Sequence, residues 1–100
     1  MVEIDKNGRI IIKFSGRLDA TNAGEVSQRI NPALENIDRD LELNVEKLEY
    51  ISSAGLQVVL KCAKAAKAAG QETYLHGAVG NVLEIFRISG FLTFLKEENG

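Results

Sequence analysis

The run LNVEKLEYISSAGLQVVL, residues 43–60, restricts the fold most, because it changes from the period of a strand to that of a helix within a few residues. Leu41, Leu43 and Val45 alternate with polar residues, a pattern typical of a strand with one buried face. Helical spacing then separates apolar Leu56, Val59, Leu60 and Ala63 from polar Gln57, Lys61, Lys64 and Lys67. Such lysines are more often a solvated helix face than a contact with an acidic partner. Residues 52–55 therefore predict a strand-to-helix turn.

The two serines of this turn have two roles open to them. A serine that precedes a helix can accept a hydrogen bond from a backbone N–H without a partner in the first turn, so either Ser52 or Ser53 could cap the helix. The same N–H groups and the positive end of the helix dipole tolerate a phosphate, so either serine could also be a phosphate acceptor. Spacing alone favours the cap, because serine is among the commonest capping residues.

The segment before this strand predicts a helix. Asn22 and Glu25 have the spacing of a capping box. The helical stripe that follows comprises Val26, Ile30, Ala33, Leu34 and Ile37. Pro32 should kink this helix or restart it with Asn31 as the new cap, because proline removes one helical hydrogen-bond donor.

The C-terminal third of the sequence predicts one strand, one helix and a short edge strand. Gly70 should end the helix that follows the serine turn, and residues 72–76 read as a strand. A short apolar stripe, closed by Gly90, comprises Val82, Ile85 and Phe86. Residues 92–95 predict a short edge strand, and 96–100 a frayed polar tail without an apolar anchor. We therefore expect one domain over residues 1–95 and a C-terminal tail over 96–100.

These elements predict an α/β domain. Asn7-Gly8, two residues that tolerate positive φ, predicts an antiparallel hairpin between 2–5 and 10–14. The later strands alternate with helices, which predicts parallel pairing through right-handed crossovers and a mixed sheet of four to five strands. The Ser53 turn then lies at the carboxyl end of a central strand, where open α/β sheets tend to have their sites.

Composition restricts the class of protein. One hundred residues, 45% hydrophobic and 26% charged, suit one folded module that is too small for a separate substrate domain. Twelve basic and 14 acidic residues give no electrostatic reason to expect nucleic acid as a partner. No apolar run approaches the roughly 20 residues that span a bilayer, and no leader pattern begins the chain, so we expect a cytoplasmic protein without direct membrane insertion. Cys62 is the only cysteine, so no internal disulfide is possible, and its apolar neighbours predict a packed thiol and not a catalytic one. His76 is the only histidine and no cysteine cluster occurs, so we expect no metal site or other cofactor.

Three segments resemble the STAS domains, the family of bacterial anti-sigma-factor antagonists. The sequence YISSAGL at 50–56 is similar to the family signature of an aromatic, an apolar residue, Asp, Ser, Ser or Thr, Gly and Leu. The sequence FSGRLD at 14–19 is similar to the family's Gly-Glu-Leu-Asp segment, and residues 82–94, with ISGF at 88–91, resemble its last helix and the turn after it. The three segments occur in the family's order and cover nearly the whole chain. The resemblance implies helices packed mainly on one side of the sheet.

Carried over by position, the phosphorylated serine of the family falls on Ser53. The family's aspartate falls on Ser52 and its following Ser or Thr on Ala54, whereas Gly55 and Leu56 match. Ser52 is not the fixed anion that could orient the acceptor or help hold a metal-bound nucleotide, but its neutrality also removes a charge that would repel a phosphate. The resemblance implies a partner-binding loop beside this turn, consisting of Leu18, Asp19, Ala20, Thr21 and Asn22. An ordinary strand-to-helix connection remains an equal alternative for the loop.

The resemblance implies a switch. The unmodified domain would bind an anti-sigma factor of the serine-kinase type and so release a sigma factor. Phosphorylation of Ser53 would add about −1.5 to −2 charges and prevent binding, and a phosphatase would reset the domain. The missing aspartate favours an alternative, a non-switching STAS scaffold in a signalling complex or membrane transporter. A serine hydrolase is disfavoured, because His76 is the only histidine base and no Gly-x-Ser-x-Gly pattern occurs, so we expect a binding protein and not an enzyme.

Overall fold

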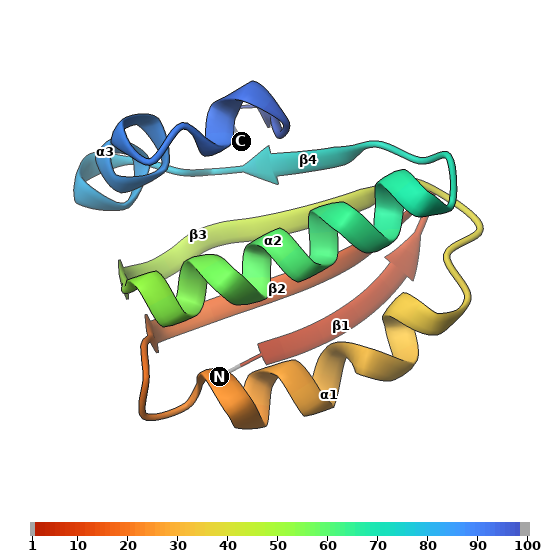
Figure 1. Cartoon of the computed structure of the whole chain (residues 1–100), viewed down its shortest axis with the longest axis horizontal. Coiled ribbons are helices and arrows are strands. Elements are labelled where there is room, and N and C mark those ends of the chain that lie inside the picture. The colour runs from red at the N-terminus through yellow and green to blue at the C-terminus, as the bar shows by residue number, and fades with distance from the viewer. Residues whose placement is uncertain (1, 99–100) are drawn as a thin grey trace.

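A five-stranded mixed sheet with three α-helices forms the structure, a computed structural model that describes residues 2–98 (Figure 1). The elements in chain order are β1 (Val2–Asn7), β2 (Arg9–Leu18), α1 (Ala23–Glu35), β3 (Leu41–Ile51), α2 (Ser53–Ala68), β4 (Thr73–His76), α3 (Gly80–Ile88), the 3-10 helix η1 (Phe91–Thr93) and β5 (Lys96–Glu98). The strands lie in sequence order, with β1 antiparallel to β2 and the later pairs parallel. Both the hairpin and the mixed α/β sheet are confirmed. Over residues 2–98, no helix combines the length and the apolar character needed to cross a membrane.

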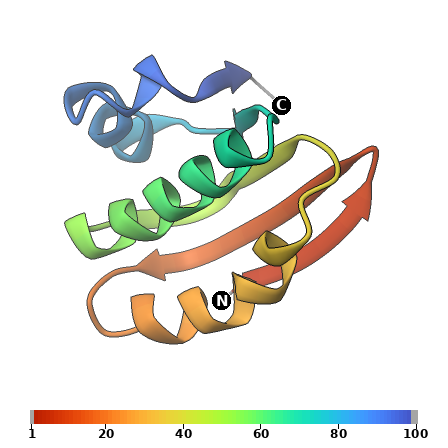
Figure 2. The same ribbon diagram turned by 45° about the vertical axis from the view of Figure 1, so that its right-hand side comes forward.

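Helices α1 and α2 lie side by side on one face of the sheet, as expected, whereas α3 follows β4 and contacts β3 (Figures 1 and 2). The strand side chains beneath the helices form rows across the sheet. In one row, Ile12 pairs with Leu43, which pairs with Leu75, and all three are fully buried. Burying a side chain of this size contributes about 1.5–3 kcal/mol, so these rows fix which face the helices cover.

The start of α1 differs from the prediction. Asn22 precedes the helix but makes no capping hydrogen bond to it. Its Oδ1 accepts a hydrogen bond from the Asp19 N–H at 3.0 Å, and its Nδ2 donates to the Arg17 carbonyl at 2.7 Å. The expected capping box with Glu25 is therefore wrong, because the preceding loop already uses the Asn22 side chain.

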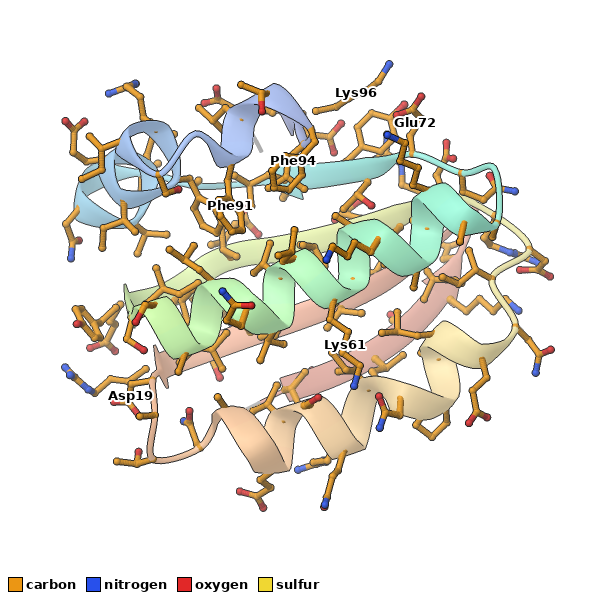
Figure 3. The ribbon with its side chains drawn as sticks, in the orientation of Figure 1. Asp19, Lys61, Glu72, Phe91, Phe94 and Lys96 are labelled. Atoms are coloured by element: carbon orange, nitrogen blue, oxygen red, sulfur yellow. The ribbon has the colours of Figure 1, made fainter. Side chains whose placement is uncertain are left out.

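The predicted restart of this helix at Pro32 is wrong as well. Helix α1 continues through Pro32 to Glu35, because the proline is exposed and removes only one donor near the helix end. Asn31 is not a new cap. Its Oδ1 accepts a hydrogen bond from the Lys61 Nζ of α2, which also donates to the Ser27 hydroxyl at 2.7 Å. Lys61 therefore points toward α1 and connects the two helices, instead of joining a solvated face (Figure 3).

The C-terminal segment is more ordered than predicted. Residues 92–95 do not form an edge strand, because 91–93 form η1 and Leu95 is buried. Lys96–Glu98 form β5, which pairs with β4, so these residues are not a frayed tail; residues 99–100 of the expected tail lie outside the described residues. Leu95 supplies the apolar anchor, and a strand of three residues is too short to show a pattern in the sequence.

A polar network on the opposite face of the sheet holds β5. Arg9 Nη1 lies 2.7 Å from Glu98 Oε1 and 3.1 Å from Glu42 Oε1, and the guanidinium carbon lies 3.8 Å from the centre of the Tyr74 ring. His76 Nδ1 lies 3.1 Å from the same Glu98 oxygen. The hydrogen bond from Arg9, with a smaller contribution from His76, lowers the pKa of Glu98 below its ordinary value. Glu98 is therefore ionised in the folded state at neutral pH.

Glu98→Gln should lower the free energy of unfolding by about 0.5–1 kcal/mol at pH 7, because it removes the charged partner of Arg9. The pKa of Glu98 is depressed by folding, so this stabilisation is present above the unfolded pKa and lost as the pH falls through the folded value. Urea denaturation at pH 7 and pH 3 should therefore give a difference between wild type and variant that shrinks in acid. Glu97→Gln is the matched control, because Glu97 is exposed; an equal effect in both variants would contradict the role of the network.

Cys62 lies on the buried side of α2, as the sequence predicted for a packed thiol. Its side chain is fully buried in the core, and burial raises the pKa of the thiol to about 12. The thiol is therefore protonated and shielded at neutral pH.

Candidate functional site at the serine turn

In the turn between β3 and α2, Ser52 and Ser53 have different roles. Ser52 is the N-cap of α2, with extended backbone (φ −99°, ψ 178°) and a side-chain oxygen that accepts a hydrogen bond from the Gly55 N–H at 3.4 Å. Ser53 is the first residue of the helix and is exposed. Within residues 2–98, its hydroxyl has no hydrogen-bond partner, so it is available to an enzyme or a protein partner.

Close packing joins this turn to the end of β2. The Ser52 N–H donates a hydrogen bond to the Leu18 carbonyl at 3.0 Å. A Cβ on Gly55 would lie 2.6 Å from that carbonyl oxygen and 2.7 Å from Ile51 Cγ1, so only glycine lets the helix begin so close to β2. Of the other turn residues, Ala54 and Leu56 are half-buried. The structure thus brings together the turn and the loop that begins at Leu18.

The loop at residues 18–22 has its own hydrogen-bonded frame. Asp19 Oδ1 accepts hydrogen bonds from the N–H and the hydroxyl of Thr21, and Arg17 Nε lies 3.3 Å from Asp19 Oδ2. The Thr21 hydroxyl first, and then its N–H and Arg17, lower the pKa of Asp19, so the loop presents a carboxylate at neutral pH (Figure 3). Ala20 and Thr21 are exposed, whereas Leu18 is buried and Asn22 is half-buried. The outer part of the loop is accessible beside the turn.

One contact beside this loop was missed in the sequence. Arg17 on β2 pairs in register with Tyr50 on β3, and its guanidinium carbon lies 4.4 Å from the centre of the Tyr50 ring. Cation–π contacts of this kind are worth about 0.5–1 kcal/mol at exposed sites. Only the parallel register of the two strands could have indicated this pair, because 33 positions separate the residues in the chain.

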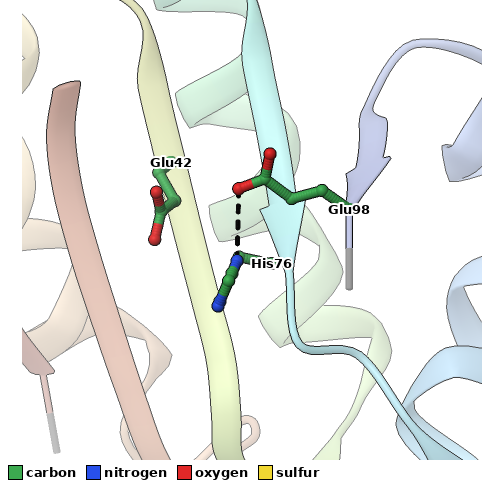
Figure 4. Close-up of side chains that lie close together, drawn as sticks. All are labelled: Glu42, His76 and Glu98. Carbon is green, nitrogen blue, oxygen red and sulfur yellow. Dashed lines mark hydrogen bonds and ion pairs between the residues drawn. The ribbon is translucent and has the colours of Figure 1, made fainter. Parts of the chain in front are cut away.

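A second cluster that the sequence missed lies on the opposite face of the sheet. One ligand atom from each of Glu42, His76 and Glu98 lies within 4.8 Å of the others, a spacing that could hold a metal ion (Figure 4). Both carboxylates also contact Arg9 Nη1, so the guanidinium already supplies the positive charge that a cation would bring. The group is best described as part of the network that holds β5.

Comparison with known proteins decides the family. The sequence matches the STAS domain family over residues 1–99. The chain belongs to the STAS domain family. This confirms the resemblance to that family.

The relatives of this STAS domain are named as antagonists of anti-sigma factors. It is 33% identical over 93 residues to the Bordetella bronchiseptica protein named "Putative anti-sigma factor antagonist BtrV", covering 93% of this chain and 80% of that protein. It is 26% identical over 89 residues to the anti-sigma-B factor antagonist of Staphylococcus aureus, covering 89% and 82%. The phosphorylated form of the Bacillus cell fate determinant SpoIIAA shares its fold, with a TM-score of 0.73, 19% identity and coverage of 98% and 91%.

Ser52→Ala should destabilise the STAS domain by about 0.5–1 kcal/mol, because a lost N-cap leaves the Gly55 N–H without its side-chain acceptor. The effect should be at the low end of the usual range, since the hydrogen bond is long at 3.4 Å. Ser53→Ala is the matched control and should change stability by less than about 0.5 kcal/mol, because the side chain is exposed. Urea denaturation of both variants tests the assignment, and a larger loss in the Ser53 variant would reverse it.

Proposed function

We propose that this STAS domain is an anti-sigma factor antagonist whose binding to an anti-sigma factor is switched off by phosphorylation of Ser53. The observation that carries the proposal is the exposed hydroxyl of Ser53 at the first residue of α2, free because Ser52 forms the cap. The names of the relatives from Bordetella and Staphylococcus support the antagonist role. The partner is an anti-sigma factor of the serine-kinase type, and the domain acts by binding and not by catalysis.

A phosphate on Ser53 would be tolerated without unfolding. The first helical hydrogen bond runs from the Leu56 N–H to the Ser52 carbonyl, so the N–H groups of Ser53 and Ala54 precede it at the positive end of the helix dipole. The first turn of α2 contains no acidic residue that would repel the phosphate. The serine at position 52, in place of the family aspartate, keeps this turn neutral. The phosphorylated domain therefore keeps its fold and changes only its surface charge.

The same charge would prevent binding. The proposed partner surface combines Ser53 with the exposed residues Ala20 and Thr21 and with the ionised carboxylate of Asp19. Phosphorylation adds about −1.5 to −2 charges to this surface, and burying that dianion in an interface would require its desolvation. The unmodified domain would then bind the anti-sigma factor and free the sigma factor, and a phosphatase would restore binding.

Phosphosite mapping of the chain purified from its native host tests the switch. Intact-protein mass and peptide mapping should find one phosphate in the wild type and in Ser52→Ala, and none in Ser53→Ala. Phosphate that persists in Ser53→Ala would place the acceptor elsewhere. The absence of phosphate under every growth condition would instead favour a non-switching scaffold, whose partner a pull-down would identify.

A further inference from the structure

A groove of about 550 Å³ lies between α2, β4 and the segment after η1. Its main lining residues are Leu60, Lys64, Lys67, Thr73, Thr93 and Phe94. A volume of this size is typical of sites for small organic ligands. Lys64 lies 11 positions after Ser53 on the same helix, which corresponds to about 16 Å along its axis at 1.5 Å per residue. The groove is therefore separate from the serine turn.

A buried hydroxyl without a partner lies in the wall of this groove. Thr73 is 3% exposed, and its Oγ1 makes no hydrogen bond to any of residues 2–98. Thr73 pairs in register with Leu41, so its side chain is on the face of the sheet that α2 covers. An unsatisfied buried hydroxyl costs about 1–3 kcal/mol, so a ligand that accepted its hydrogen bond would recover that cost. Because the Oγ1 atom is itself shielded from solvent, a ligand acceptor would reach it only after a small movement of the groove wall.

Positive charge borders the same groove. Lys64 and Lys67 lie one turn apart on α2, are exposed, and form no ion pair with residues 2–98. Glu72 adds one negative charge at the groove, so the two amines leave it net positive. An anionic group is the complement of this arrangement.

The opposite wall is aromatic. Phe94 is 43% exposed although its ring packs on Phe91 with centroids 4.9 Å apart (Figure 3). Leu60 is half-buried and lies on the α2 side of the groove. A flat apolar group between these walls would remove exposed aromatic surface from water, which contributes about 25 cal/mol per Å² buried.

We propose that this groove binds a small organic anion with a flat apolar body. The acid group lies near the amines of Lys64 and Lys67 and accepts a hydrogen bond from the Thr73 hydroxyl. The apolar body packs between Phe94 and Leu60. Binding does not depend on phosphorylation of Ser53, so this inference stands apart from the proposed switch.

Titration of the ¹⁵N-labelled chain with 8-anilinonaphthalene-1-sulfonate, an aromatic anion, tests the proposal. Amide resonances of the groove residues should shift and saturate together, whereas those of the serine turn should not. Lys64→Gln with Lys67→Gln should raise Kd about tenfold. Lys13→Gln with Lys47→Gln is the control, since it removes the same charge from exposed residues outside the groove and should leave Kd within twofold.

Two further measurements distinguish a specific anion-binding site from a general apolar patch. N-phenyl-1-naphthylamine has the same aromatic body without the sulfonate, and it should bind more weakly and be insensitive to the lysine changes. Thr73→Val should weaken the sulfonate about fivefold while raising the melting temperature, because it removes the unpartnered hydroxyl without changing the side-chain shape. Shifts spread over other surfaces, equal losses in both lysine pairs, or equal affinity for the neutral probe would overturn the proposal.

Discussion

A chain carrying phosphoserine at position 53 should bind its anti-sigma factor about a hundredfold more weakly than the unmodified chain. The reason is local, because Ser53 is exposed in a turn that is hydrogen-bonded to the end of β2, and the phosphate adds about −1.5 to −2 charges there. A hundredfold loss corresponds to about 2.8 kcal/mol, which desolvation of the dianion in the interface can supply. Genetic incorporation of phosphoserine, followed by calorimetric titration with the partner isolated by pull-down, measures the effect without relying on a kinase.

Phosphoserine at position 89 is the matched control, because Ser89 is exposed at the end of α3 and lies outside the turn and the loop. The control should bind within about twofold of the unmodified chain. Ser53→Ala should also bind normally, since it removes the acceptor without adding charge. Equal weakening by phosphoserine at both positions would mean that net charge, and not the serine turn, governs binding.

Gly55→Ala should lower the free energy of unfolding by about 2–3 kcal/mol. The added Cβ would lie 2.6 Å from the Leu18 carbonyl oxygen and 2.7 Å from Ile51 Cγ1, so the start of α2 must move away from β2. The same movement would lengthen the Ser52 to Leu18 hydrogen bond and disturb the turn that presents Ser53. Urea denaturation measures the stability, and chemical shifts of the turn residues measure the displacement.

Gly24→Ala is the control for this substitution. Gly24 lies in α1 with open space around its Cβ position, so alanine there should stabilise the protein by up to about 1 kcal/mol through its higher helix propensity. The two glycine variants should therefore change stability in opposite directions. A loss below about 0.5 kcal/mol in Gly55→Ala would show that the close approach of the helix and β2 is not needed.

The sequence predicted the elements whose periodicity is long and uniform. The strand at residues 41–45 and the helix after Ser53 were recognisable because apolar spacing changed from two to nearly four residues, and hydrophobic burial obeys that spacing. The capping box at Asn22 and the restart at Pro32 failed for another reason. The Asn22 side chain has several possible partners within a few residues, and a single lost donor at Pro32 does not outweigh the packing of a whole helix.

The candidate site was predictable in position but not in detail. The strand-to-helix turn located Ser52 and Ser53, yet only the structure distinguishes the capping serine from the exposed one. The Arg17–Tyr50 contact and the contacts of Glu98 depend on strand register between distant segments. Short-range patterns contain no information on register between strands that a helix separates, so these contacts could not be read from the sequence.

Because Cys62 lies in the core, the reactivity of its thiol can report local unfolding of the protein. As the only thiol in the chain, fully buried and with its pKa raised to about 12, it should resist an alkylating reagent for as long as α2 remains packed on the sheet. The rate of labelling then measures how often the helix detaches, without a dye or an engineered label. Comparing the rate of Cys62 labelling with and without a bound partner would measure how much binding stabilises the packing of α2 on the sheet.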